Sequence, residues 1–254
     1  MSELLKHYRN VHQQAFMPIF VDDGRDHRKE VEACVEAGMT AIEYTLRCPD
    51  SKEIIPWIVK TFPELTLVIG STIDNDKIRN HCKIRYPQQM SLDELADLGV
   101  HGFVSMLPFS EQTLQKWSPT HLTMPIAVTH YEAYMTVCAG AHFAKMNGPT
   151  HDDLKKARAA AAFDYAPILF TGGQTQDTIP DTFAAGAACV ATGFDLTLKD
   201  MNDDPEVSAI ADRMREYLSV SQDAQATCHP ELAANKDADD ATWLASLPHY
   251  HPFG

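Results

Sequence analysis

The stretch EAGMTAIEYTLR, residues 36–47, decides the fold, because it runs from the end of a helix directly into a strand with two different faces. Side chains alternate along a strand, so every second residue points to the same side. One side here is polar and the other apolar, with Glu43, Thr45 and Arg47 opposite Ile42, Tyr44 and Leu46. The segment predicts a strand whose apolar side packs under helices and whose polar side faces the axis of a closed barrel.

Short apolar segments separated by helix-like segments recur along the rest of the chain. This alternation is typical of parallel strands with helical crossovers. Eight such strands close a barrel. The eight candidates begin near Pro18, Thr40, Leu65, Gly102, Pro125, Ala141, Pro167 and Ala187. The sequence therefore predicts an α/β fold, a (β/α)8 TIM barrel.

Three of the helices have clear signatures in the sequence. Ser91 and Glu94 have the spacing of a capping box, which predicts a helix that starts there and ends near Gly99. Residues 152–163 are rich in strong helix formers and would link the sixth and seventh strands. Residues 207–218 have one apolar helical face, as expected of the eighth barrel helix.

The chain of 254 residues is long enough for one barrel domain, which we place at residues 1–220. Residues 221–254 turn polar and are expected to form an irregular C-terminal extension. Two outcomes remain open for it. Its aromatic residues favour docking on the barrel or on a neighbouring subunit, whereas a disordered tail usually carries fewer of them.

Composition excludes several classes of function. The formal charge of −14 disfavours nucleic-acid binding, which needs clustered Lys and Arg. No apolar run approaches the ~20 residues that span a bilayer, and the N-terminus lacks the apolar stretch of a secretory signal, so we expect a cytoplasmic protein. The six cysteines are scattered without C-x-x-C or zinc-ligand spacing, which indicates reduced thiols. No H-x-x-x-H pair and no histidine with two carboxylates has metal-ligand spacing, so no metal site is expected.

The residue with the most specific chemistry is Lys145, in FAKMNGP at residues 143–149. In an eight-stranded barrel it ends the sixth strand and faces Glu43 on the second strand across the axis. Burial disfavours the charged form of an amine, and Phe143 and Met146 offer apolar walls for it. A neutral amine opposite a carboxylate can form an imine with a ketone substrate. The alternatives are a solvated lysine and a structural ion pair between Glu43 and Arg47.

The other candidates lie where strands end. Gly172 and Gly173 with Thr171 follow the seventh strand, and Gly193 follows the eighth. Loops at these two places often bind phosphate in such barrels, although a Gly-Gly pair is as often an ordinary turn. Thr72 ends the third strand beside Arg47, where it would orient a substrate carboxylate or simply cap the strand.

Taken together, these residues resemble the class I 2-keto-3-deoxy-6-phosphogluconate (KDPG) and 4-hydroxy-2-oxoglutarate (KHG) aldolases, over about residues 17–198. The resemblance implies a homotrimer that needs neither metal nor cofactor and that splits a 2-keto-4-hydroxy acid into pyruvate and an aldehyde. It also implies a role for each matching residue. Lys145 resembles the Schiff-base lysine, Glu43 the general acid and base, Arg47 the clamp for the substrate carboxylate, Thr72 and Thr171 positioning residues, and Gly172 with Gly173 the phosphate-binding turn.

The chain departs from the family at the end of the eighth strand. The phosphogluconate enzymes have Gly-Gly-Ser there, whereas Gly193 is followed here by Phe194. A phenylalanine removes a hydroxyl that would bind phosphate. We therefore expect a weaker preference for a phosphorylated substrate than is usual in the family.

The sequence thus predicts a Schiff-base aldolase acting on a small keto acid. Two other hypotheses remain. One is a metal-assisted aldolase or decarboxylase of oxo acids on a similar barrel. The other is a non-catalytic barrel that binds a keto acid or a sugar phosphate, with Lys145 as an electrostatic anchor.

Overall fold

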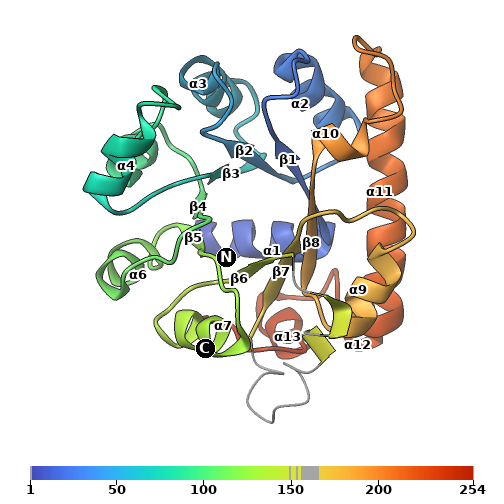
Figure 1. The fold of residues 1–254 in the computed structure, drawn as a ribbon. Helices are drawn as coiled ribbons and strands as arrows, with labels where there is room; N and C mark the ends of the chain where they lie inside the picture. The colour runs from blue at the N-terminus through green and yellow to red at the C-terminus, as the bar shows by residue number, and fades with distance from the viewer. Residues whose placement is uncertain (1, 149, 153, 156–165, 254) are drawn as a thin grey trace.

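The computed structural model describes residues 2–148, 150–152, 154–155 and 166–253, and its centre is one sheet of parallel strands (Figure 1). The order of the strands is β5-β4-β3-β2-β1-β8-β7-β6. Their bounds are β1 Phe16–Phe20, β2 Ala41–Thr45, β3 Thr66–Gly70, β4 Gly102–Val104, β5 Leu122–Met124, β6 Ala144–Asn147, β7 Ile168–Thr171 and β8 Cys189–Gly193.

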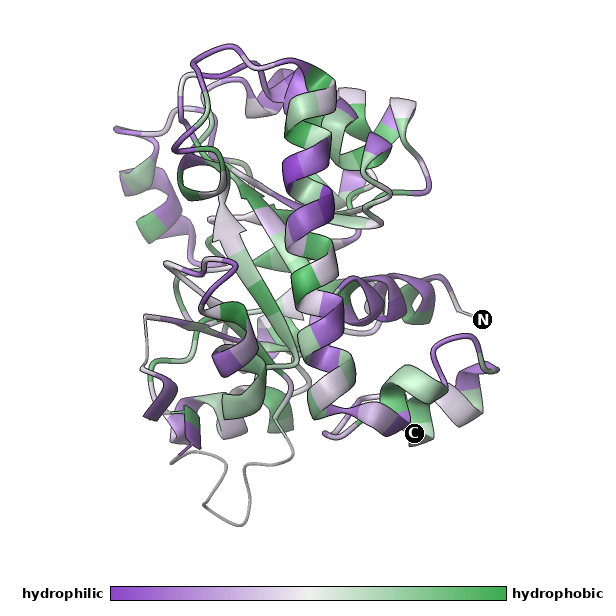
Figure 2. Cartoon of the chain, turned by 90° about the vertical axis from the view of Figure 1, so that its right-hand side faces the viewer, coloured by the Kyte–Doolittle hydropathy of each residue, from purple (hydrophilic) through white to green (hydrophobic). Residues whose placement is uncertain are grey.

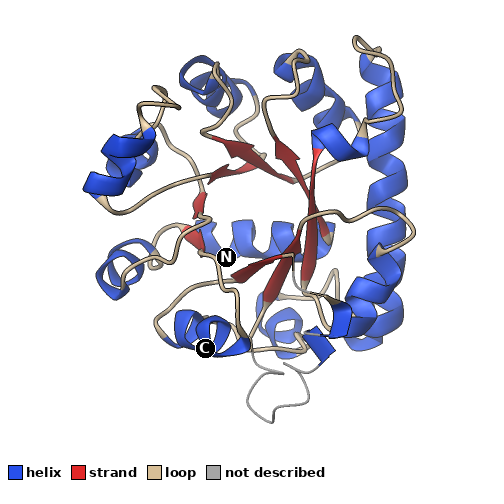
Figure 3. Ribbon diagram, viewed as in Figure 1, coloured by secondary structure: helices blue, strands red, loops and turns tan. Residues whose placement is uncertain are grey.

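Backbone contacts between the two outermost strands close the ring. Ile126, just after β5, forms a parallel bridge with Lys145 of β6. The Lys145 N–H donates to the Pro125 carbonyl at 2.9 Å, and the Ala127 N–H donates to the Lys145 carbonyl at 2.8 Å. The predicted (β/α)8 barrel is confirmed, with strands inside and helices around them (Figure 3).

Helices follow the strands and cover the outside of the barrel (Figure 1). The barrel helices are α2 His27–Glu36, α3 Ser51–Thr61, α4 Asp76–Cys82, α5 Leu92–Asp97, α6 Glu111–Trp117, α7 His130–Cys138, α9 Ile179–Ala185, α10 Phe194–Thr197 and α11 Val207–Cys228. The capping box expected at Ser91 and Glu94 is present, and α5 ends before Gly99. None of the described helices combines the length and the apolar character that crossing a membrane requires.

One sequence-based strand boundary is wrong. The fifth strand was expected to begin at Pro125, but it ends at Met124. A proline has no N–H to donate to a strand ladder, so the pairing beyond it is reduced to a single bridge. The helix expected over residues 152–163 lies for the most part outside the described residues.

The apolar side chains form two layers, as the alternation in EAGMTAIEYTLR predicts. Ile42, Tyr44 and Leu46 belong to the cluster between strands and helices. Ala41, on the other face of β2, belongs to a second cluster inside the barrel, together with residues of helix α1 (Glu3–Gln14). This inner cluster fills the end of the barrel where the strands begin.

The C-terminal extension is helical rather than irregular. Helix α11 continues to Cys228, so the expected boundary at residue 220 falls inside it, and α12 (Pro230–Ala234) and α13 (Asp240–Ala245) follow. Figure 2 shows these last helices beside the lower part of α11. Trp243 of α13 is fully buried and packs near Tyr8 and His12 of α1. Of the two outcomes left open by the sequence, the extension docks on the barrel.

Candidate active site

Lys145 and Glu43 meet inside the barrel, as expected from the sequence. They lie on β6 and β2, which are four strands apart in a ring of eight and therefore face each other across the axis. The Lys145 Nζ lies 3.1 Å from each carboxylate oxygen of Glu43. The side chains are only 4% and 2% exposed. Glu43 is paired with Lys145 and shows no ion pair with Arg47 among the described residues, which removes one of the alternatives above.

Gly70 on β3 makes room for this pair. A Cβ at position 70 would collide with the carboxylate of Glu43 and would lie 2.8 Å from the Thr45 side chain. Since real Cβ atoms do not approach so closely, any larger residue at this position would displace the carboxylate. The glycine of Gly70-Ser71-Thr72 is therefore part of the geometry of the site.

A cavity of about 530 Å³ opens above the pair, at the end of the barrel where the strands finish. It is lined by five of the residues singled out from the sequence: Lys145, Glu43, Arg47, Thr72 and Thr171. This end of the barrel is where the catalytic residues of such folds lie. The amine and the carboxylate therefore sit at the floor of a pocket large enough for a small keto acid.

Arg47 and Thr72 are held differently from each other. The Thr72 hydroxyl donates to the Val104 carbonyl at 2.8 Å, which fixes the side chain while leaving the oxygen able to accept. Arg47 is exposed at the cavity, and the Gln88 side chain donates to its carbonyl at 3.1 Å. A rigid hydroxyl and an accessible guanidinium suit the positioning of a carboxylate, because the guanidinium offers two parallel donors.

The glycines Gly172, Gly173 and Gly193 do not line this cavity. Gly172 and Gly173 have φ values of 100° and 69°, so they form a tight turn that favours glycine. A Cβ at Gly172 would lie 2.7 Å from the Asn147 side-chain oxygen, and one at Gly193 would meet a carboxylate oxygen of Asp195. The structure does not bring these glycines into the pocket of Lys145, and their binding of phosphate stays a prediction.

One expectation about the walls around Lys145 is wrong. Phe143 belongs to the inner cluster below the lysine, as expected. Met146 belongs instead to the outer cluster, between the strands and the helices. Neighbouring residues on a strand point to opposite sides, so Met146 cannot face the same space as Lys145.

Several polar residues of the cavity were not singled out from the sequence: Tyr86, Gln89 and Asn147. Gln89 donates to the Ser71 carbonyl at 3.3 Å, and its side-chain oxygen is buried without a partner in the described part of the chain. Asn147 is recognisable in principle, because it lies two residues after Lys145 on the same face of β6. Gln89 lies in the long connection after α4, where no periodic pattern predicts which way a side chain points.

Residues able to hold a metal ion lie elsewhere. The described residues form two groups of three potential ligands, and both contain His27, which does not line the cavity. The pocket itself offers Glu43 and Cys82, but no such group of three among its described residues.

Comparison with known proteins agrees with the geometry. No family model matches the chain. It is 27% identical to the 2-dehydro-3-deoxy-6-phosphogalactonate aldolase of Escherichia coli strain K12 over 171 residues, which are 65% of this chain and 76% of the relative. The fold is similar to a native KDPGal structure, with a TM-score of 0.64 at 19% identity over 82% of this chain and 95% of the other. It is also similar to the KDPG aldolase of Legionella pneumophila with pyruvate captured as a covalent carbinolamine, with a TM-score of 0.58 at 15% identity over 82% and 96%.

Proposed function

We propose, on the premise that this chain is an aldolase related to the KDPG and KHG enzymes, that it cleaves a 2-keto-4-hydroxy acid to pyruvate and an aldehyde through a Schiff base on Lys145. The observation that carries the proposal is the buried contact of 3.1 Å between Lys145 Nζ and Glu43 at the floor of a cavity. An ion pair at this distance can pass one proton from the ammonium to the carboxylate, which leaves a neutral amine ready to attack.

The proposed reaction proceeds in four steps. The amine adds to the substrate ketone, Glu43 returns its proton to the hydroxyl of this adduct, and loss of water gives a protonated imine. Glu43, directly or through a water, removes the proton of the hydroxyl on C4. The C3–C4 bond then breaks, the aldehyde leaves, and the electron pair moves toward the imine nitrogen to form an enamine. Glu43 returns the proton to C3, and water releases pyruvate and the free lysine.

The rest of the cavity serves binding in this proposal. Arg47 clamps the keto-acid carboxylate with two parallel donors, and Thr72 and Thr171 position the reacting carbons. The carbinolamine captured in the Legionella relative supports the same type of intermediate here. Neither metal nor cofactor enters the mechanism.

A homotrimer in the cytoplasm is part of this proposal. Val128, Tyr131 and Met135, in and just before α7, are 68%, 64% and 48% exposed. Large apolar side chains gathered on one surface indicate a contact with another protein. This surface supports a subunit interface. The molar mass of the protein in solution gives the number of chains in the assembly and so tests the homotrimer.

Reductive trapping tests the proposed function. Borohydride in the presence of pyruvate should leave a reduced adduct on Lys145, located by mass spectrometry of the peptides. The Lys145→Met variant should lose both the adduct and the activity, whereas the exposed Lys60→Met variant should keep them. Glu43→Gln should lower kcat by about 10² to 10⁴, because proton transfer is lost.

The rival hypotheses give different results in the same experiment. Cleavage by active protein without an adduct on Lys145 would contradict the Schiff base, and loss of activity in chelator would favour metal assistance. Thermal stabilisation by pyruvate without turnover or trapping would indicate a barrel that only binds its ligand.

A further inference from the structure

A group of acceptor side chains surrounds one histidine beside the mouth of the barrel. Asp23 lies in the connection after β1, and His27 and Glu30 are one turn apart on α2. One ligand atom from each of the three lies within 4.8 Å of the others. His27 and Glu30 are buried, and none of the three lines the cavity that contains Lys145.

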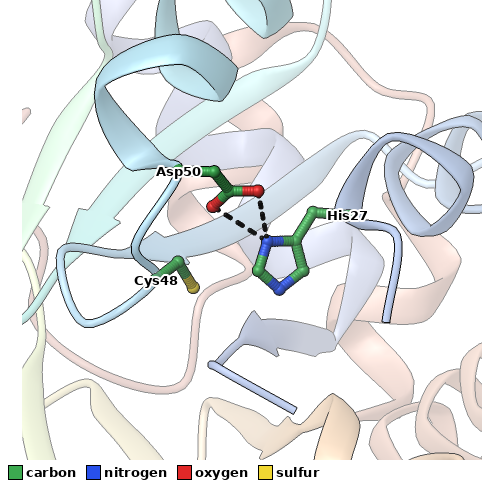
Figure 4. A group of neighbouring side chains, drawn as sticks. All are labelled: His27, Cys48 and Asp50. Carbon is green, nitrogen blue, oxygen red and sulfur yellow. Dashed lines mark hydrogen bonds and ion pairs between the residues drawn. The ribbon is translucent and has the colours of Figure 1, made fainter. Parts of the chain in front are cut away.

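The hydrogen bonds on the Nδ1 side of His27 determine where its proton lies. Nδ1 is 3.0 Å from an Asp50 carboxylate oxygen, and Figure 4 shows the two groups facing each other, with Cys48 nearby. The Tyr44 hydroxyl donates to Asp50 at 2.6 Å, so its own oxygen accepts from Nδ1 at 2.8 Å. Both neighbours of Nδ1 are thus acceptors, and the network assigns the hydrogen to Nδ1. A carboxylate that receives the Nδ1 hydrogen is a common support for a metal-binding histidine.

The Nε2 side of the ring likewise faces only hydrogen-bond acceptors. Nε2 lies 3.0 Å from the Val21 carbonyl oxygen and 4.0 Å from Asp23 Oδ1. Glu30 is fully buried, and neither of its carboxylate oxygens accepts a hydrogen bond from a donor group among the described residues; its polar neighbour is the side chain of Asp23. Two buried carboxylates side by side are costly, so this arrangement favours either a proton shared between them or a cation among the acceptors.

We propose that a divalent transition-metal cation binds at this point, with His27 Nε2, Asp23, Glu30 and the Val21 carbonyl as its ligands. A proton on Nε2 would satisfy the Val21 carbonyl and leave both oxygens of Glu30 without a donor, whereas a cation held by His27, Asp23 and Glu30 would also lie next to the Val21 carbonyl. An imidazole with three oxygens suits Mn²⁺ or Zn²⁺, because Mg²⁺ and Ca²⁺ prefer oxygen alone.

The role of this cation is structural. Its ligands join the end of β1 to the first turns of α2, and Asp23 is also held by Arg25 at 2.9 Å. Since these residues are absent from the Lys145 cavity, the cation takes no part in the proposed imine chemistry. The site is therefore separate from the metal-assisted aldolase considered among the rival hypotheses.

Metal binding to the whole protein tests the proposal. After treatment with chelator and removal of the chelator, the protein should take up one equivalent of Mn²⁺ or Zn²⁺, measured by elemental analysis. The melting temperature should rise by about 5–10 °C at a metal concentration one hundred times the dissociation constant, and Mg²⁺ at the same concentration should give a smaller shift.

Two matched variants locate the site. Glu30→Gln keeps the shape of the side chain and should weaken Mn²⁺ binding at least about tenfold, because it removes a charged ligand. Glu32→Gln makes the same change at an exposed position of the same helix and should leave binding unchanged. Asp50→Asn, which alters the support of His27, should weaken binding about tenfold or more. The melting temperature of each variant without metal shows whether it folds.

The rival occupant of the site is a proton. Burial, together with the charge of Asp23, raises the pKa of Glu30 to about 9, so a protonated Glu30 beside Asp23 is the alternative. No bound metal, or equal metal shifts in Glu30→Gln and Glu32→Gln, would overturn the proposal. Trapping of pyruvate on Lys145 in chelator is independent of this result, so failure of one inference is distinguishable from failure of the other.

Discussion

At Gly193 the space that a Cβ would occupy is taken by a carboxylate oxygen of Asp195, and Phe194 between them is buried. Loops after the seventh and eighth strands often bind phosphate in barrels of this kind. A carboxylate 4 Å from a phosphate charge costs on the order of 1 kcal/mol in water and about 4 kcal/mol at an effective dielectric constant of 20. We therefore expect both residues to disfavour a phosphorylated aldehyde half.

We predict that Asp195→Asn raises kcat/KM for a phosphorylated 2-keto-4-hydroxy acid about tenfold, because removing the charge recovers about 1.4 kcal/mol. The value for an unphosphorylated substrate should not change. A coupled assay of pyruvate release measures both, with the exposed Asp203→Asn as the control for net charge. A strong preference of the unaltered protein for the phosphorylated substrate would show this prediction to be wrong.

The element that distinguishes this chain from a plain barrel is the helical extension after α11. Trp243 of α13 is fully buried, and the Arg9 guanidinium of α1 lies 5.2 Å from the centre of its ring. Arg9 also pairs with Asp240 at 3.1 Å. These contacts fasten the extension to α1, at the end of the barrel opposite the Lys145 cavity.

The extension should stabilise the fold without forming part of the site. Trp243→Ala is expected to lower the free energy of unfolding by about 3–5 kcal/mol, which corresponds to a fall in melting temperature of about 10 °C. Tyr250→Ala, at an exposed position of the same extension, should change the stability by no more than about 0.5 kcal/mol. Equal melting temperatures for the two variants would mean that the docking seen here contributes nothing to stability.

For the whole molecule, buried neutral histidines make stability depend on pH. Burial lowers the pKa of His142 to about 3, and burial is also the main reason that the pKa values of His7, His101 and His249 fall to about 4. The usual value is 6.5, so below it the unfolded chain binds protons that the folded chain does not. Their contribution to stability is complete above pH 6.5 and is lost progressively as the pH falls toward 4.

We predict that the melting temperature falls between pH 7 and pH 5, with each buried histidine contributing up to about 1.4 kcal/mol per pH unit. His142→Asn should reduce this slope by about one proton, because asparagine does not titrate. The fold should persist, since the amide oxygen can accept from the Thr123 N–H, which donates to His142 Nδ1 at 3.2 Å. His81→Asn, at an exposed position, serves as the control. A melting temperature that stays constant or rises on acidification over this range would contradict the prediction.

The sequence alone determined the barrel and the opposition of Lys145 and Glu43, because strand alternation is a local rule and a ring of eight strands fixes which ones face each other. The same rule, applied strictly, also places Met146 outside. Tertiary structure alone decided which loops meet. No local pattern brings Gln89 to the cavity or Trp243 to α1, since these contacts join segments distant in the chain and depend on packing.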